Sequence, residues 1–128
     1  MFPLPDCAAF FPFFPYGLAA QQVLEARGLW DAVQDRLVRG ENIGQTYQFV
    51  VSGNAELGFV AYAQLVHPDG SVEGSVWLPP ADLYTPIEQQ AILLRHGADN
   101  AAAKAFLDYA RGPAGRALIQ RYGYALPK

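Results

Sequence analysis

The stretch from Arg36 to Tyr62 constrains the fold most strongly, because it reads as a strand, a helix and a strand joined by very short turns. A short apolar run at 37–38 precedes a Gly-Glu-Asn turn that ends at Asn42. Asparagine is a favoured N-cap, since its side-chain oxygen accepts a hydrogen bond from a free backbone N–H of the first turn. Apolar residues then recur at helical spacing, at Ile43, Tyr47 and Val50.

The end of this stretch predicts a helix stop and a second strand. Gly53 and Asn54 stand where a helix would end in the left-handed conformation. The continuous apolar run 57–62 is typical of a strand that is covered on both faces. Such a βαβ unit directs the N-terminus of its helix toward the carboxyl edge of the sheet, where open α/β sheets bind ligands. Its free N–H groups and the helix dipole make it a candidate anion site, although most helix N-termini bind only water.

Charge and composition exclude several classes of partner. The chain has 128 residues, a size that predicts one domain burying roughly two thirds of its unfolded surface. A hydrophobic share of 52% indicates a globular chain. The net charge of −3 and the absence of a Lys/Arg cluster argue against nucleic acid and anionic membranes. A small-anion site stays open, since local dipoles suffice for it.

The sequence contains no recognisable pattern of catalytic or metal-binding residues. The single cysteine, Cys7, allows no disulfide within the chain. His67 and His96 stand in predicted loops and do not have the clustered spacing of metal ligands. We therefore expect both to be ordinary loop residues, with no cofactor.

The first fourteen residues differ from the rest. They are rich in phenylalanine, contain no Lys or Arg and are interrupted by prolines. A secretory signal needs a basic start and an unbroken apolar core, so this is a poor export signal. We expect a disordered or loosely packed arm, with an apolar segment that pairs with another copy as the alternative.

The remainder alternates helices and short strands. Helices are predicted from Pro15 to Gly28, from Ala101 to Arg111 with Asp99 or Asn100 as the cap, and from Pro113 to Arg121. Short strands are predicted at 76–78 and 91–94. The order favours an α/β domain whose sheet is incomplete, because doubly wound sheets usually have about four to six strands.

Four ordered stretches resemble the C-terminal part of the molybdate-binding periplasmic proteins of ABC transporters. They are PYGLAAQQVLEARGLW (15–30), LVRGENIGQTYQFVVSGNAELGFVAYAQL (37–65), PADLYTPIEQQAILL (80–94) and AKAFLDYARGPAGRALIQRYGY (103–124). The resemblance implies a type II periplasmic-binding-protein fold, with two α/β lobes and a tetrahedral oxyanion held between them by uncharged donors. It also implies a periplasmic location, molybdate or tungstate as the ligand and a transporter permease as a partner.

The resemblance carries over to four positions. Tyr16 and Ile43, at the starts of two helices, match positions that bind the oxyanion through the main chain. A third family position, a tyrosine in some members, aligns near Ala61. In this chain the tyrosine stands one residue later, at Tyr62. Sulfate and other oxyanions remain open as ligands.

The four stretches match only the later part of the family pattern, so we expect the chain to lack the N-terminal half, which in the family supplies two hydroxyl-bearing ligand positions. Residues 1–14 do not resemble that half or the strand expected before Pro15. We expect an arm at 1–14, part of the second lobe at 15–66, a crossing segment at 67–80 and the C-terminal part of the first lobe at 81–128.

Two functions of different classes follow. On the first, we expect the chain to be a truncated oxyanion-binding module that binds weakly or not at all as a monomer and needs a missing half or exchange between copies. Alternatively, it is a non-binding fragment that acts through self-association. An enzyme has no support in the sequence.

Overall fold

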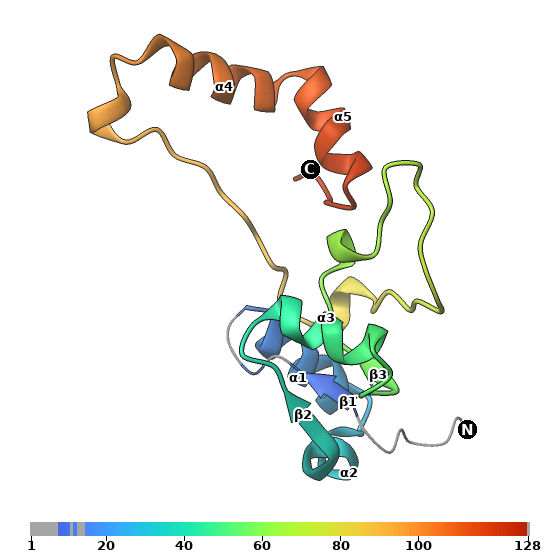
Figure 1. Cartoon of the computed structure of the whole chain (residues 1–128). Helices are drawn as coiled ribbons and strands as arrows, with labels where there is room; N and C mark the ends of the chain where they lie inside the picture. The colour runs from blue at the N-terminus through green and yellow to red at the C-terminus, as the bar shows by residue number, and fades with distance from the viewer. Residues whose placement is uncertain (1–7, 11, 13–14, 128) are drawn as a thin grey trace. The chain divides into compact units, whose positions relative to one another are not determined.

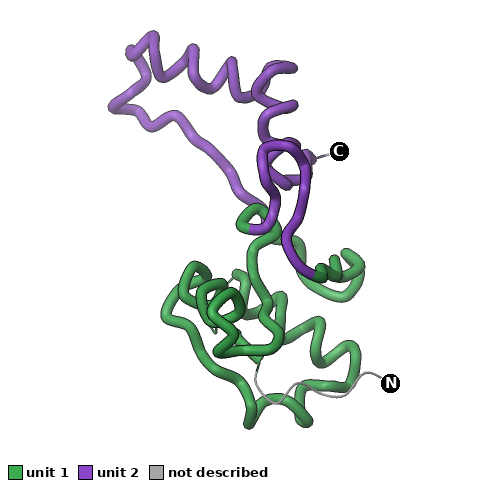
Figure 2. The backbone as a smooth tube through the Cα atoms, turned by 45° about the vertical axis from the view of Figure 1, so that its right-hand side comes forward, with its two compact units in different colours: residues 1–64, 75–87 green, residues 65–74, 88–128 purple. Residues whose placement is uncertain are grey.

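The computed structural model describes residues 8–10, 12 and 15–127, which fall into two compact units. Unit 1 comprises residues 1–64 and 75–87, and unit 2 comprises residues 65–74 and 88–128 (Figure 2). Part of the predicted crossing segment therefore packs within unit 1, while the lobe boundaries stay predictions. No described helix has the length and apolar character needed to cross a membrane.

Unit 1 is built on a small parallel sheet of three strands. These are β1 (Ala8–Phe10), β2 (Leu37–Arg39) and β3 (Leu57–Gly58), in the order β2-β1-β3 (Figure 1). Ala8 is aligned with Leu37 on one side and with Leu57 on the other. The predicted strand-helix-strand unit is thus present, but its two strands lie on either side of β1 rather than next to each other.

The central strand corrects the prediction of an N-terminal arm. Ala8, Ala9 and Phe10 are all buried, and β1 pairs with both other strands. The prediction of a loosely packed arm is therefore wrong for these three residues. The rest of the predicted arm, apart from Pro12, lies outside the described residues.

The helices of unit 1 are α1 (Tyr16–Ala26), the short α2 (Trp30–Val33) and α3 (Ile43–Val51). As predicted, Asn42 caps α3, and Gly53 adopts a left-handed φ of 74° beyond its end. The chain crosses from β1 to β2 in one direction and from β2 to β3 in the other. Because such crossovers are almost always right-handed, α1 and α3 cover opposite faces of the sheet.

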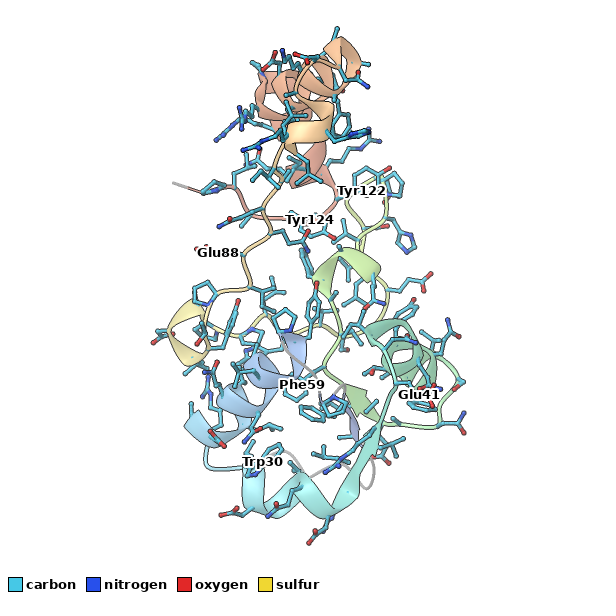
Figure 3. All side chains as sticks on the ribbon, turned by 90° about the vertical axis from the view of Figure 1, so that its left-hand side faces the viewer. Trp30, Glu41, Phe59, Glu88, Tyr122 and Tyr124 are labelled. Carbon is cyan, nitrogen blue, oxygen red and sulfur yellow. The ribbon has the colours of Figure 1, made fainter. Side chains whose placement is uncertain are left out.

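A small core holds these layers together. Its buried apolar residues come from β1, α1, the end of α2 and the loops before and after β3: Ala8, Ala9, Phe10, Ala19, Ala20, Val23, Leu24, Val33, Ala55 and Ala61. Trp30, labelled in Figure 3, packs edge-on against Phe10 with ring centroids 6.0 Å apart. The strand predicted over residues 57–62 is shorter in the structure: β3 ends at Gly58, and a 3₁₀ turn occupies Tyr62–Gln64.

Residues 75–87 pack on α1 without forming a strand. Gln22 Oε1 accepts a hydrogen bond from Thr85 N at 2.8 Å, and Gln22 Nε2 donates one to the Thr85 hydroxyl at 3.1 Å. The Arg27 guanidinium lies 5.3 Å from the centre of the Trp77 ring. The predicted strand at 76–78 is wrong, since this segment has no strand partner among the described residues.

Unit 2 contains α4 (Ala101–Arg111) and α5 (Pro113–Arg121). Asn100 caps α4 by accepting from the N–H groups of Ala102 and Ala103 at 2.9 and 3.1 Å, which decides between the two predicted caps. The predicted strand at 91–94 is not formed. Large apolar side chains remain exposed, among them Tyr122 and Tyr124, which are labelled in Figure 3. The predicted class, α/β with an incomplete sheet, is confirmed.

Candidate functional site

All four predicted site residues follow the carboxyl ends of the strands of unit 1. Tyr16 is the first residue of α1, Ile43 is the first residue of α3, and Ala61 and Tyr62 follow β3. In a parallel sheet these strand ends share one edge, which is the edge where ligands bind in this class of fold. The structure therefore gathers these positions at the carboxyl edge of the sheet.

The start of α3 is fixed by a compact set of caps. Asn42 Oδ1 accepts from Gln45 N at 2.8 Å, and Gln45 Oε1 accepts from Glu41 N at 2.6 Å. The fully buried Thr46 donates its hydroxyl to the Asn42 carbonyl at 3.2 Å. Within the part of the chain that the structure describes, no acceptor is recorded for the N–H groups of Ile43 and Gly44. Together with the helix dipole, these N–H groups favour a negatively charged acceptor.

Gly40 brings the end of β2 directly against this helix start. Its N–H donates to the Phe10 carbonyl at 2.9 Å, which extends the pairing beyond the strands. A Cβ at this position would overlap the Thr46 hydroxyl and would lie 3.0 Å from Thr46 N. Only glycine fits here without a clash. Because Gly40 has no side chain, the start of α3 can lie close to the end of β2.

Gln64 connects the loop after β3 to the start of α3. Its Oε1 accepts from Ala61 N at 3.0 Å, and its Nε2 donates to the Ile43 carbonyl at 3.4 Å. The structure thus brings Ile43 and Ala61 together through a side chain that the sequence did not single out. Its spacing from Ala61 is that of a capping box, but Ala61 lacks the hydroxyl that makes this signal readable.

The two remaining predicted positions are Tyr16 and Tyr62. Tyr16 is half-buried at the start of α1, where Pro15 accepts a hydrogen bond from Ala19 N at 3.2 Å. Tyr62 is half-buried in the turn that Gln64 closes. A direct role for either residue in holding an anion stays a prediction.

Asn42→Ala is expected to destabilise the start of α3. The variant loses the acceptor for Gln45 N, and loss of such a cap costs about 1 kcal/mol. Asn42→Asp keeps the acceptor and is expected to stay close to the parent. Urea unfolding of the three proteins measures the difference, and equal midpoints for all three would show that the cap does not stabilise this helix.

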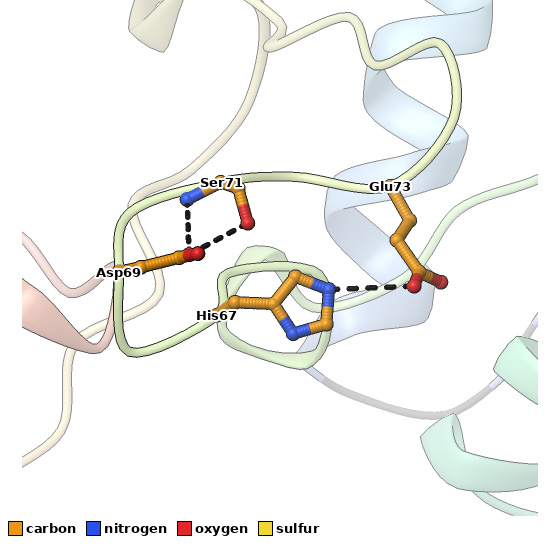
Figure 4. Close-up of polar contacts among 4 residues, drawn as sticks. All are labelled: His67, Asp69, Ser71 and Glu73. Atoms are coloured by element: carbon orange, nitrogen blue, oxygen red, sulfur yellow. Dashed lines mark hydrogen bonds and ion pairs between the residues drawn. The ribbon is translucent and has the colours of Figure 1, made fainter.

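The loop 66–74 belongs to unit 2 and forms a separate polar cluster (Figure 4). Asp69 accepts from the Ser71 hydroxyl at 2.6 Å and from Ser71 N at 2.9 Å, and these bonds lower the pKa of its carboxyl. His67 Nε2 lies 3.6 Å from Glu73 Oε1 on the exposed surface. Among the described residues, no group of three or more His, Cys, Asp or Glu side chains is placed to hold a metal ion.

Comparisons with known proteins place the chain in a family. The family model described as bacterial extracellular solute-binding protein matches residues 12–125. The chain is 52% identical over 113 residues to the molybdate-binding protein ModA of Azotobacter vinelandii and 46% identical over 110 residues to that of Rhodobacter capsulatus. These alignments cover 88% and 86% of this chain, but only 44% and 42% of the relatives.

Solved structures agree with this assignment. The periplasmic molybdate-binding protein of Azotobacter vinelandii superposes with a TM-score of 0.86 at 39% identity, covering 98% of this chain and 56% of that one. The substrate-binding domain of a putative molybdenum ABC transporter from Clostridium difficile has a TM-score of 0.74 at 24% identity, which supports the fold. The predicted partial periplasmic-binding-protein fold and the resemblance to molybdate-binding proteins are confirmed. With the family model matching most of its length, the chain belongs to the bacterial extracellular solute-binding proteins.

Proposed function

We propose that this chain supplies one wall of a binding site for a tetrahedral oxyanion, molybdate or tungstate, in the solute-binding protein of an ABC transporter. The observation that carries the proposal is the gathering of the α1 and α3 N-termini and the Ala61 loop at one carboxyl edge. Uncharged donors of this kind bind dianions without needing net positive charge. The names of the relatives favour molybdate, the periplasm and a binding role over catalysis.

A single wall predicts weak binding. An oxyanion held from one side keeps much of its hydration, so each hydrogen bond adds little net free energy. The chain spans less than half of the length of the curated relatives, so the opposite wall of the proposed site lies outside the matched region or comes from a second copy. We therefore expect tight binding only when a second wall is supplied.

Thermal unfolding against increasing molybdate tests the proposal, with sulfate as the control anion. A ligand at about 100 times its dissociation constant stabilises the folded state by about 2.7 kcal/mol. A saturable rise in the melting temperature that is larger with molybdate than with sulfate is expected. A flat response to both anions up to millimolar concentrations would contradict oxyanion binding by this chain.

Ile43→Pro removes one proposed donor while leaving α3 able to form. Proline is favoured at the first position of a helix, and the preceding Asn42 has φ −153° and ψ 169°, which suits a residue before proline. In a site with one wall, where the anion stays partly hydrated, the loss of one hydrogen bond costs about 0.5–1.5 kcal/mol, so affinity for molybdate should fall by roughly twofold to tenfold. Ile43→Val keeps the N–H and is the matched control. Equal molybdate affinities of the two variants would show that Ile43 N does not bind the anion.

Self-association without ligand is a second candidate, and the surface of unit 2 favours it. Among the described residues of unit 2, only Gly115 is buried. Ile92, Leu94 and Phe106 are 82%, 67% and 68% exposed, and such apolar surface promotes association. Sedimentation velocity across a range of protein concentrations tests this function. Concentration-dependent size that does not change with molybdate supports it, and a monomer at all concentrations excludes it.

A further inference from the structure

The Gln64 side chain joins two parts of the candidate site that are far apart in sequence. It accepts from Ala61 N at 3.0 Å and donates to the Ile43 carbonyl at 3.4 Å, the long end of the hydrogen-bond range. Both contacts are partly buried, which shields them from competing water. Among the described residues, the bond from Gln64 Nε2 to the Ile43 carbonyl is the only side-chain hydrogen bond between the loop after β3 and α3.

An amide side chain is the chemical group that this bridge requires. Its oxygen accepts while its NH₂ donates, and neither a carboxylate nor an aliphatic side chain can do both. The Ile43 carbonyl and the Gly44 N–H belong to one planar peptide unit. A donor on this carbonyl therefore fixes the direction of the neighbouring N–H at the start of α3.

The same contact occupies the N–H of Ala61, the residue that aligns near the third family position. With Gln64 Oε1 as its acceptor, this N–H is already satisfied by the protein itself. Ala61 is buried, so its backbone has little room to turn toward another acceptor. The contribution of this loop is thus to hold its shape beside α3 rather than to offer the Ala61 N–H.

We propose that Gln64 is a positioning residue of the oxyanion site, which sets the distance between the loop after β3 and the start of α3. This inference rests on the proposed function. It predicts that Gln64 acts on affinity and on anion selectivity, since discrimination between molybdate and the smaller sulfate depends on the spacing of the donors. The stability of the fold should change little.

Three variants separate this role from a general loss of structure. Gln64→Met keeps the length of the side chain and removes both hydrogen bonds. Gln64→Glu keeps an acceptor for Ala61 N and loses the donor to the Ile43 carbonyl. Gln48→Met is the matched control, since Gln48 is exposed on α3 and its side chain has no recorded hydrogen bond within the described part of the chain.

Amide hydrogen exchange without ligand tests the bridge itself. In Gln64→Met the Ala61 amide should exchange about tenfold faster than in the parent, since a partly buried hydrogen bond protects it. In Gln64→Glu and Gln48→Met its exchange should match that of the parent. Unchanged exchange in Gln64→Met would overturn the bridge.

Equilibrium dialysis with molybdate and with sulfate tests the positioning role. Gln64→Met should bind molybdate about tenfold more weakly, the scale for losing contacts that orient binding groups. Its ratio of molybdate affinity to sulfate affinity should also fall. Partial unfolding would instead weaken the binding of both anions equally and leave this ratio unchanged. Parent-like affinity and ratio in Gln64→Met overturn the positioning role. No binding of either anion by the parent overturns the proposed function instead, and the exchange result still decides whether Gln64 bridges the two segments.

Discussion

Replacing Gly40 with alanine is expected to lower the free energy of unfolding by about 1–3 kcal/mol, the usual cost of overpacking a filled site. The new Cβ would overlap the Thr46 hydroxyl and would lie 3.1 Å from the Asn42 carbonyl oxygen. Thr46 is fully buried and its hydroxyl is bonded to that carbonyl, so it cannot turn away without loss. The start of α3 must therefore move away from the sheet.

Urea unfolding of a small set of variants measures this effect. Gly40→Ala combined with Thr46→Ala should recover part of the loss, because the overlapping hydroxyl is gone. Gly97→Ala is the control, since its Cβ would approach only the tip of the Leu93 side chain, at 3.3 Å. Displacement of α3 also moves a proposed donor, so Gly40→Ala should bind molybdate more weakly than the parent. A Gly40→Ala protein as stable as the parent would show that the strand end and the helix start are not closely packed.

Helix boundaries could be predicted from the sequence because their causes are local. Asn42 and Asn100 each cap a helix with their own side chain, over a span of two or three residues. Gly53 follows α3 with a positive φ, and Gly112-Pro113 separates α4 from α5. Each of these signals depends on the chemistry of one or two residues, which the sequence displays directly.

Strands could not be predicted equally well, because a strand is stabilised by partners that are distant in sequence. Ala8–Phe10 has no alternating pattern and stands among prolines, yet it is the central strand because Leu37–Arg39 and Leu57–Gly58 pair with it. The segments 76–78 and 91–94 are apolar enough for strands, but none of the described residues pairs with them. Apolar composition alone therefore predicted two strands too many and missed the one at the centre.

The candidate site shows the same division between local and distant causes. Helix starts at Tyr16 and Ile43 were readable, and the topology then brings them to a common edge of the sheet. The contact of Gln64 with Ile43 could not be predicted, since the two residues are 21 positions apart in the sequence. The residues that begin helices were therefore predictable, and the one that holds them in place was not.

Gly115→Ala is expected to destabilise the pair of helices α4 and α5 by about 3 kcal/mol, the upper part of the range for overpacking. A Cβ here would overlap the Tyr109 carbonyl and lie 2.6 Å from Ala110 Cα and 2.8 Å from the Ala110 carbonyl oxygen. These are backbone atoms, so no change of rotamer relieves the overlap. Gly115 is also the one buried residue among those described in unit 2, so the contact that it allows is the centre of the helix pair.

The sign of the change separates close packing from helix propensity. Alanine is favoured over glycine inside a helix by about 1 kcal/mol, so propensity alone predicts that Gly115→Ala slows amide exchange in α5. Overlap with the end of α4 predicts faster exchange in both helices, because their contact must open. Gly97→Ala in the same unit should leave this exchange unchanged, since its Cβ meets only a side-chain tip. Slower exchange in Gly115→Ala would therefore show that α4 and α5 do not pack through this glycine and that each helix is held by its own backbone hydrogen bonds.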